Sequence, residues 1–165
     1  MSLFCDAFNA HPRTLHLPVY VEHIETMRAL ERERHVQAVL QLGREVTTAA
    51  FTVGPIAPDA TLFSLDYFTQ DERDHLLEHA AGDICSRFYD DEGRVCLPEL
   101  DARTVAVPLA DLLTTERRVC TAGGRSKVRP LAVALAAGYV THLATDAATA
   151  RGVLEYSERK GLGTA

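Results

Sequence analysis

The segment from Cys120 to Glu155, CTAGGRSKVRPLAVALAAGYVTHLATDAATARGVLE, constrains the fold of this chain more than any other. Its pattern predicts a strand that ends in two glycines, a helix, a second strand and a second helix. Strands that alternate with helices are typical of a parallel sheet covered by helices. The sequence therefore predicts an α/β fold with a mostly parallel sheet.

The spacing of apolar residues and the turn signals predict the remaining elements. Residues 69–72 carry the capping-box pattern, Thr69 followed by Glu72, which predicts the start of a helix. Residues 83–89 and 94–97 are expected to pair as a hairpin around the turn at 91–93, an antiparallel insertion in the parallel plan. The other predicted helices span 3–9, 22–44, 71–81 and 109–114, and the other predicted strands span 14–17, 48–53 and 104–107.

Length and composition limit what the chain does. A chain of 165 residues, 47% hydrophobic and 24% charged, fits one soluble domain with a real core. A net charge of −6 makes a DNA-binding surface on this chain unexpected. No apolar run approaches the ~20 residues needed to cross a bilayer, and the first residues do not resemble a secretory signal. The cysteines are far apart without a CxxC pair, which indicates reduced thiols and a cytoplasmic location.

Two glycines and a lysine mark the best candidate for an anion site. Gly123 and Gly124 end the predicted strand and allow a tight turn that brings backbone close to a ligand. The helix that follows points its N–H groups and the positive end of its dipole at the same place, and Lys127 adds a charge. This is the edge of an open α/β sheet where ligands bind. A plain turn followed by a solvated lysine would give the same local sequence.

Three further residues lie where a ligand could be held. Asp83 follows a glycine and precedes an apolar pair, and a carboxylate there is costly unless it is paired or binds hydroxyls or a cation. It could equally be a turn aspartate that accepts a hydrogen bond from its own backbone. We expect Cys85 to be a small buried apolar residue. Gly54 ends the strand 48–53 at the carboxyl edge of the sheet, or simply forms a turn.

The sequence HLLEH, residues 75–79, matches the H-x-x-E-H pattern of one class of zinc peptidases. Two histidines four residues apart lie on one face of a helix and could share a metal. A third ligand is also needed, however, and the helix is short, so that its residues Leu76 and Leu77 must face the core of the protein. We therefore predict that His75 and His79 bind no metal, and nothing in the sequence calls for a cofactor.

Three segments in a fixed order carry a family resemblance: Val53-Gly54, then GDICSRF at 82–88 with its Asp-Glu-Gly turn, then AGGRSK at 122–127. Over residues 15–154 the chain resembles the C-terminal effector-binding domain of SorC-type bacterial transcriptional regulators, which sense sugars and sugar phosphates. The resemblance implies a Rossmann-like fold, a sheet with helices on both faces, which is similar to the fold of sugar-phosphate isomerases and deaminases. It also implies ligand-binding positions: Asp83 for sugar hydroxyls, Lys127 for the anionic or hydroxyl end, Cys85 nearby, and Gly54 and Gly124 in the loops.

The departures from this family shape the remaining expectations. The chain shows no helix-turn-helix segment and no Gly/Thr-rich phosphate loop, so we expect residues 1–165 to form one effector-binding domain truncated at its N-terminus. DNA would then be bound only through a segment absent from this chain. An incomplete sheet would expose an edge and favour a homo-oligomer.

Two enzyme readings stand beside the sensor reading. A sugar-phosphate isomerase or deaminase needs a second acid or base near Asp83, and none is evident, so no catalytic residue is assigned. The other is a zinc hydrolase built on His75, Glu78 and His79.

Overall fold

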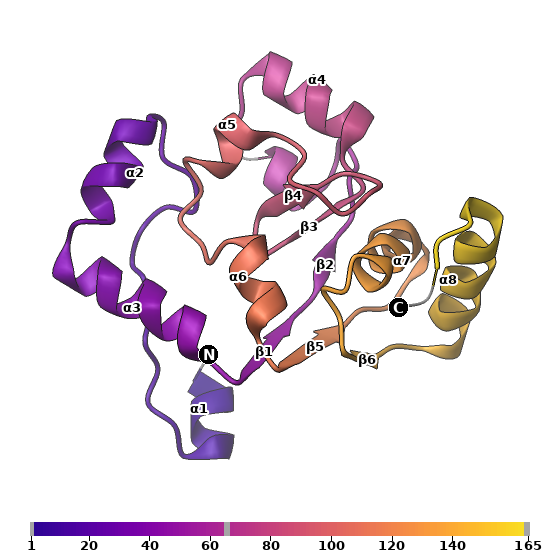
Figure 1. The fold of residues 1–165 in the computed structure, drawn as a ribbon, viewed down its shortest axis with the longest axis horizontal. Coiled ribbons are helices and arrows are strands. Elements are labelled where there is room, and N and C mark those ends of the chain that lie inside the picture. Colours follow the sequence, from indigo (N-terminus) through magenta and orange to yellow (C-terminus); the bar gives the residue numbers. More distant parts are fainter. Residues whose placement is uncertain (1, 65–66, 164–165) are drawn as a thin grey trace.

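The computed structural model describes residues 2–64 and 67–163, which form helices and short strands (Figure 1). The α-helices are α1 (Ser2–Phe8), α2 (Ile24–Leu30), α3 (Arg34–Glu45), α4 (Gln70–His79), α5 (Pro98–Asp101), α6 (Leu109–Thr114), α7 (Val128–Ala136) and α8 (Ala147–Lys160). The strands are β1 (Thr48–Phe51), β2 (Val53–Gly54), β3 (Gly82–Ile84), β4 (Arg87–Tyr89), β5 (Arg117–Thr121) and β6 (His142–Ala144). Short 3-10 turns, η1 (Thr61–Ser64) and η2 (Arg125–Lys127), complete the chain. No helix in the described ranges combines the length and the apolar character needed to span a membrane.

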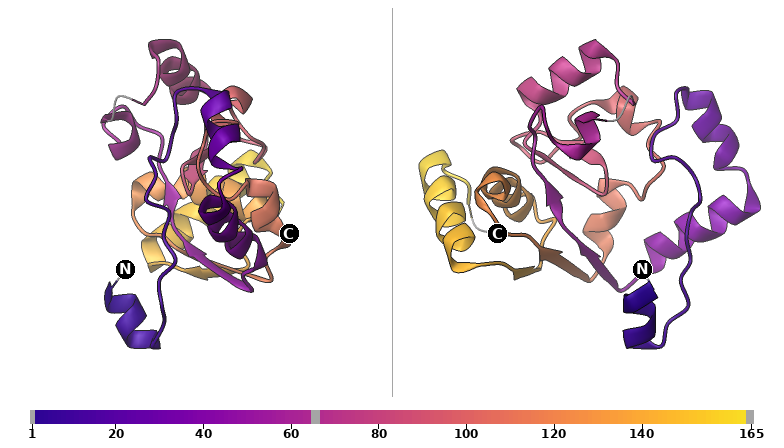
Figure 2. Two further views of the ribbon diagram at one scale, coloured as in Figure 1. Left: turned by 90° about the vertical axis from the view of Figure 1, so that its left-hand side faces the viewer. Right: turned by 180° about the vertical axis from the view of Figure 1, so that it is seen from behind.

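The C-terminal segment folds as its sequence pattern predicts. Strands β1, β5 and β6 form a parallel sheet in that order, with Ala50 opposite Val119 and Cys120 opposite Leu143. Helices α7 and α8 lie beside each other next to this sheet (Figures 1 and 2). The α/β class with a parallel sheet is therefore confirmed.

A second, antiparallel sheet joins the first through a shared strand. After Thr52 the chain of β1 continues as β2, which pairs with β3, and β3 pairs with β4. In Figure 1 this strand runs upward from the parallel sheet into the antiparallel one. The start of β2 therefore lies where the two sheets meet.

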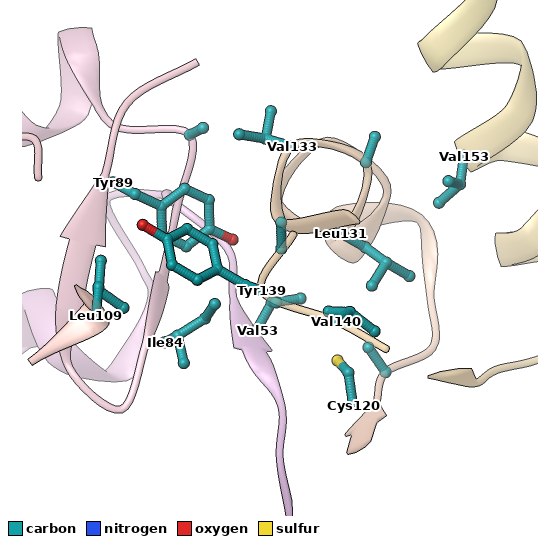
Figure 3. Close-up of a cluster of buried hydrophobic side chains, with 14 of the residues drawn as sticks. Val53, Ile84, Tyr89, Leu109, Cys120, Leu131, Val133, Tyr139, Val140 and Val153 are labelled. Carbon is teal, nitrogen blue, oxygen red and sulfur yellow. The ribbon is translucent and has the colours of Figure 1, made fainter. Parts of the chain in front are cut away.

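The largest apolar core fills the space between the two sheets and α7. Figure 3 shows Val53 of β2 and Ile84 of β3 on one side, with Leu131 of α7 and Cys120 of β5 on the other. All four side chains are fully buried. Tyr89 lies in the same core and donates its hydroxyl hydrogen to the carbonyl oxygen of Pro130 over 2.9 Å, which fixes α7 against the antiparallel sheet.

The hairpin differs from the sequence prediction. Residues 83–89 do not form one strand, because the chain reverses at Cys85 and Ser86, whose φ angles are +51° and +67°. This is a two-residue turn of the kind that normally uses Asn-Gly, so Cys-Ser gives no warning of it. The predicted partner segment survives only as an isolated bridge between Tyr89 and Val95.

The predicted strands 14–17 and 104–107 are wrong. Residues 14–17 form no strand, and Thr104 forms a single antiparallel bridge with Tyr20. The carbonyl groups of the second segment are instead bound by the buried side chain of Arg87, which donates to Thr104, Ala106 and Val107. The same guanidinium forms an ion pair with Asp101 at 2.6 Å.

The predicted helix 22–44 is two helices, interrupted at residues 31–33. Met27 of α2 packs against Val21 and Val105, whereas Val36 and Leu40 of α3 are buried elsewhere. The residues between them are charged and exposed, so no packing keeps the two helices in one register. Helix α4, by contrast, begins with the predicted capping box, in which Thr69 and Glu72 exchange hydrogen bonds of 2.9 and 3.2 Å.

Candidate functional site

The end of β2 brings together three of the residues that the sequence singles out. Gly54 lies opposite Asp83 in the β2–β3 pairing, so closely that a methyl group on Gly54 would lie 1.6 Å from Oδ1 of Asp83. Lys127, in η2, donates a hydrogen bond from Nζ to the carbonyl oxygen of Val53. A carboxylate and an ammonium group therefore converge on two consecutive residues at the junction of the sheets.

The carboxylate of Asp83 is partly buried, and its oxygen atoms can accept further hydrogen bonds. Burial raises the pKa of its carboxyl group, while the hydrogen bond from the Ser86 N–H and the charge of Lys127 oppose that rise. The Ser86 nitrogen lies 3.1 Å from Oδ2. A carboxylate offers about four acceptor positions, and among the described residues this N–H is the group that donates to it. The remaining positions can accept hydrogen bonds from hydroxyl groups of a ligand.

Tyr20 belongs to this site although no sequence pattern marks it. Its hydroxyl group donates to the carbonyl oxygen of Ser86 over 2.6 Å. Burial raises the pKa of Tyr20, and the negative charge of Asp83 raises it further. Ser86 is thus bound from both sides, by Asp83 through its N–H and by Tyr20 through its C=O, which fixes the turn after β3.

Gly124 is held by a different set of contacts. Its N–H donates to Oγ1 of Thr149 over 2.8 Å, and that hydroxyl donates to Asp146 over 2.7 Å. Asp146 also caps α8 by accepting from the Thr149 N–H, and these bonds lower the pKa of its carboxyl group. A methyl group on Gly123 would lie 2.8 Å from Asp146. The glycine pair therefore joins the start of η2 to the start of α8, an arrangement that the Asp-x-x-Thr cap pattern could have indicated.

Cys85 lies at the tip of the β3–β4 turn. Its side chain is exposed, so the expectation of a buried apolar residue is wrong. The reason is the left-handed backbone at this position, which turns the side chain away from the sheet. Cys85 remains two residues from Asp83 along the hairpin.

The two histidines of α4 lie side by side, with ring centroids 4.6 Å apart. Nε2 of His75 lies 3.3 Å from the carbonyl oxygen of Cys96, and His79 lies 3.7 Å from Glu78. Within the described ranges no three histidine, cysteine or acidic side chains are grouped so as to hold a metal. That this chain binds no zinc stays a prediction.

Comparison with known proteins assigns the chain to a family. Residues 1–155 match the family described as "Putative sugar-binding domain". The chain belongs to this family of sugar-binding domains. The curated relatives and solved structures that it matches are transcriptional regulators.

The relatives of this sugar-binding domain are longer proteins. The deoxyribonucleoside regulator of Bacillus subtilis (strain 168) is 39% identical over 154 residues, which is 93% of this chain and 49% of the regulator. The sugar-binding domain thus spans about half the length of the curated relatives it matches.

Solved structures share the fold of this sugar-binding domain. A transcriptional regulator from Streptococcus pneumoniae TIGR4 matches with a TM-score of 0.87 and 25% identity, over 94% of this chain and 60% of that one. The full-length sorbitol operon regulator SorC from Klebsiella pneumoniae matches with a TM-score of 0.81 and 22% identity, over 91% of this chain and 49% of that one. The second likeness concerns the fold alone.

Proposed function

We propose that this sugar-binding domain is the effector sensor of a SorC-type regulator and that it binds a sugar or sugar phosphate at the end of β2. The observation that carries the proposal is that Asp83 lies opposite Gly54 while Lys127 binds the carbonyl oxygen of the preceding residue, Val53. Asp83 accepts hydrogen bonds from sugar hydroxyls, and Lys127 exchanges its bond to the Val53 carbonyl for the anionic or hydroxyl end of the ligand.

The glycine turns serve this site by giving it room. Gly54 leaves space for the Asp83 carboxylate. Gly124 has a φ of +104°, which glycine adopts without strain, and this backbone conformation precedes Lys127 in the turn. Cys85 lies on the same hairpin and forms part of the rim. The full regulator would bind DNA through a segment outside this chain, act in the cytoplasm and associate with further copies.

The domain acts as a sensor and not as an enzyme in this proposal. Proton transfer on a sugar needs an acid or base within hydrogen-bond reach of the reacting carbons. Asp83 accepts a hydrogen bond from Ser86 and is influenced by the charge of Lys127, and we assign a binding role, not a proton-transfer role, to both side chains. The sugar should therefore leave the site unchanged, as nuclear magnetic resonance of the incubated ligand would show.

A thermal-shift screen over free and phosphorylated sugars tests the proposal. A ligand at 100 times its dissociation constant should stabilise the domain by about 2.7 kcal/mol and raise its melting temperature by several degrees. Lys127→Ala should weaken phosphorylated sugars more than free ones, because it removes a charge. Asp83→Ala should weaken both kinds, because they share their hydroxyl groups.

Lys160→Ala is the matched control, since Lys160 is an exposed lysine at the far end of α8. It should leave every shift unchanged. The proposal fails if no sugar stabilises the domain, or if Lys127→Ala and Lys160→Ala have the same effect.

A further inference from the structure

Tyr20 lies on the same face of the antiparallel sheet as Asp83. Val53 and its partner Ile84 lie in the core beside α7 (Figure 3). Side chains alternate between the two faces of a sheet, so Asp83 lies on the other face, together with Phe88, its partner in the pairing of β3 with β4. Tyr20 packs in the same buried cluster as Phe88. Its hydroxyl group therefore approaches the turn after β3 from the face that carries the Asp83 carboxylate.

A closed ring of contacts fixes Tyr20 relative to this turn. The backbone of Tyr20 forms an antiparallel bridge with Thr104, flanked by two backbone hydrogen bonds of 2.7 and 3.1 Å. The carbonyl oxygen of Thr104 accepts a hydrogen bond of 3.1 Å from the side chain of Arg87, the residue that follows Ser86. The hydroxyl group of Tyr20 closes the ring by donating to the carbonyl oxygen of Ser86 over 2.6 Å. Tyr20, Thr104 and Arg87 are all buried, so the ring has little freedom to move.

The turn needs such a support, because its backbone is left-handed at two consecutive residues other than glycine. Cys85 and Ser86 have φ angles of +51° and +67°, which residues with a side chain adopt at a cost. In this conformation the N–H of Ser86 lies 3.1 Å from Oδ2 of Asp83. Oδ1 of the same carboxylate lies over Gly54, where another residue would have its side chain. The turn thus orients the carboxylate, with one oxygen bound to Ser86 and the other directed across β2.

We infer that Tyr20 is a positioning residue of the effector site: by holding the carbonyl group of Ser86 it keeps the N–H of Ser86 on Asp83, and so orients the carboxylate that accepts the sugar hydroxyl groups. This inference rests on the proposed function and assigns Tyr20 no contact with the sugar. Without the tyrosine hydroxyl the turn relaxes and the carboxylate is no longer held in one orientation. Recognition of hydroxyl groups should then weaken, while the charge of Lys127 stays in place.

Hydrogen exchange of the Ser86 amide, followed by nuclear magnetic resonance on the 165-residue chain without any sugar, tests the positioning step. Tyr20→Phe removes the donor but keeps the ring that packs against Tyr67 and Phe68, at centroid distances of 5.6 and 5.1 Å. Relative to the amides of β5, the Ser86 amide should exchange roughly fivefold faster, the factor that corresponds to one ordinary hydrogen bond. Asp83→Ala gives the rate for an amide that has lost its bond to the carboxylate.

Tyr139→Phe is the matched control, because Tyr139 is a buried tyrosine whose hydroxyl group also donates to a turn carbonyl, that of Gly93, over 2.6 Å. It should lower the melting temperature of the domain about as much as Tyr20→Phe does, but leave the relative exchange rate of the Ser86 amide unchanged. A Ser86 amide that exchanges equally fast in Tyr20→Phe and in wild type overturns the inference. So does an equal acceleration in Tyr139→Phe, which would reveal a general loosening of the domain.

The thermal-shift screen over free and phosphorylated sugars, repeated on both variants, tests the consequence for binding. Each sugar that stabilises the wild type should give a smaller shift with Tyr20→Phe and the full shift with Tyr139→Phe. In the Asp83→Ala background Tyr20→Phe should cause no further loss for the phosphorylated sugars, because Tyr20 acts only through Asp83. Additive losses overturn the inference, since Tyr20 would then contact the sugar itself. If no sugar stabilises the wild type, the proposed function fails, and the exchange rate of the Ser86 amide still decides the role of Tyr20.

Discussion

Replacing Gly54 with alanine should destabilise the domain through Asp83 alone. The new methyl group would lie 1.6 Å from Oδ1 and 2.7 Å from Cγ of Asp83, so the carboxylate must move. Forcing an extra methyl group into a packed position costs about 1–3 kcal/mol. Moving the carboxylate also strains its 3.1 Å hydrogen bond from Ser86, and bonds to charged groups contribute about 1.5–3 kcal/mol. We expect a loss of at least about 2 kcal/mol.

Urea unfolding followed by circular dichroism measures this loss. For a domain of this length about 2 kcal/mol corresponds to a fall of roughly 4–8 °C in melting temperature. Effector binding should be lost in the same variant, since the displaced carboxylate is the group proposed to accept the sugar hydroxyls.

A double-mutant cycle isolates the cause. In the Asp83→Ala background the carboxylate is gone, so Gly54→Ala should cost close to nothing and can even stabilise β2 by about 0.5 kcal/mol through reduced chain entropy. Gly124→Ala is the comparison: it meets no atom within 4 Å but has a φ of +104°. Its strain, about 1–3 kcal/mol, should be the same in both backgrounds. Equal costs of Gly54→Ala in the two backgrounds would refute the reasoning.

Three further variants test other parts of the structure. Burial raises the pKa of Asp83, so the charge of this carboxylate in the folded state lowers the stability of the domain as the pH rises. Asp83→Asn should therefore be more stable than wild type at neutral pH, and the difference should shrink as the pH falls and Asp83 becomes protonated. Urea titrations at several pH values measure this difference. Ser86→Gly should stabilise the hairpin by about 1 kcal/mol, because glycine accepts the φ of +67° without strain; an unchanged unfolding midpoint would contradict this. Arg87→Lys should lower the free energy of unfolding by about 2–4 kcal/mol, because the three N–H donors of a lysine cannot replace all the bonds of the buried guanidinium group. The control Arg94→Lys, at an exposed position, should change the free energy of unfolding by less than about 0.5 kcal/mol.

The parts of the fold that local signals specify could be predicted. The glycine pair after Thr121 and the apolar spacing that follows indicated β5, α7, β6 and α8 in order, and the capping box at Thr69 located the start of α4. The turn at Cys85 and Ser86 could not be predicted, because its residues are not those that the left-handed backbone prefers. The conformation of the segment after Asp101 could not be predicted either, because its carbonyl groups accept hydrogen bonds from the side chain of Arg87, which is not a neighbour in the sequence.

Some residues of the candidate site could likewise be predicted from the sequence, whereas their arrangement could not. Asp83 is recognisable because a carboxylate between a glycine and an apolar pair is costly, and Lys127 because it follows two glycines at the start of a helix; the family motifs point to both. Their meeting point could not be read from the sequence, because it depends on β2 leaving the parallel sheet to pair with β3. Tyr20 escaped notice for a related reason: it reaches Ser86 across 66 positions of sequence, and nothing near it in the chain distinguishes it from a core aromatic residue.

The two sheets are joined by one continuous stretch of backbone, since β1 leads through Thr52 into β2. Hydrogen bonds to β5 on one part and to β3 on the other restrict how far this backbone can shift, whereas a loop in the same place would absorb a displacement. A movement of Gly54 when an effector binds would therefore also displace β1 and, through it, β5.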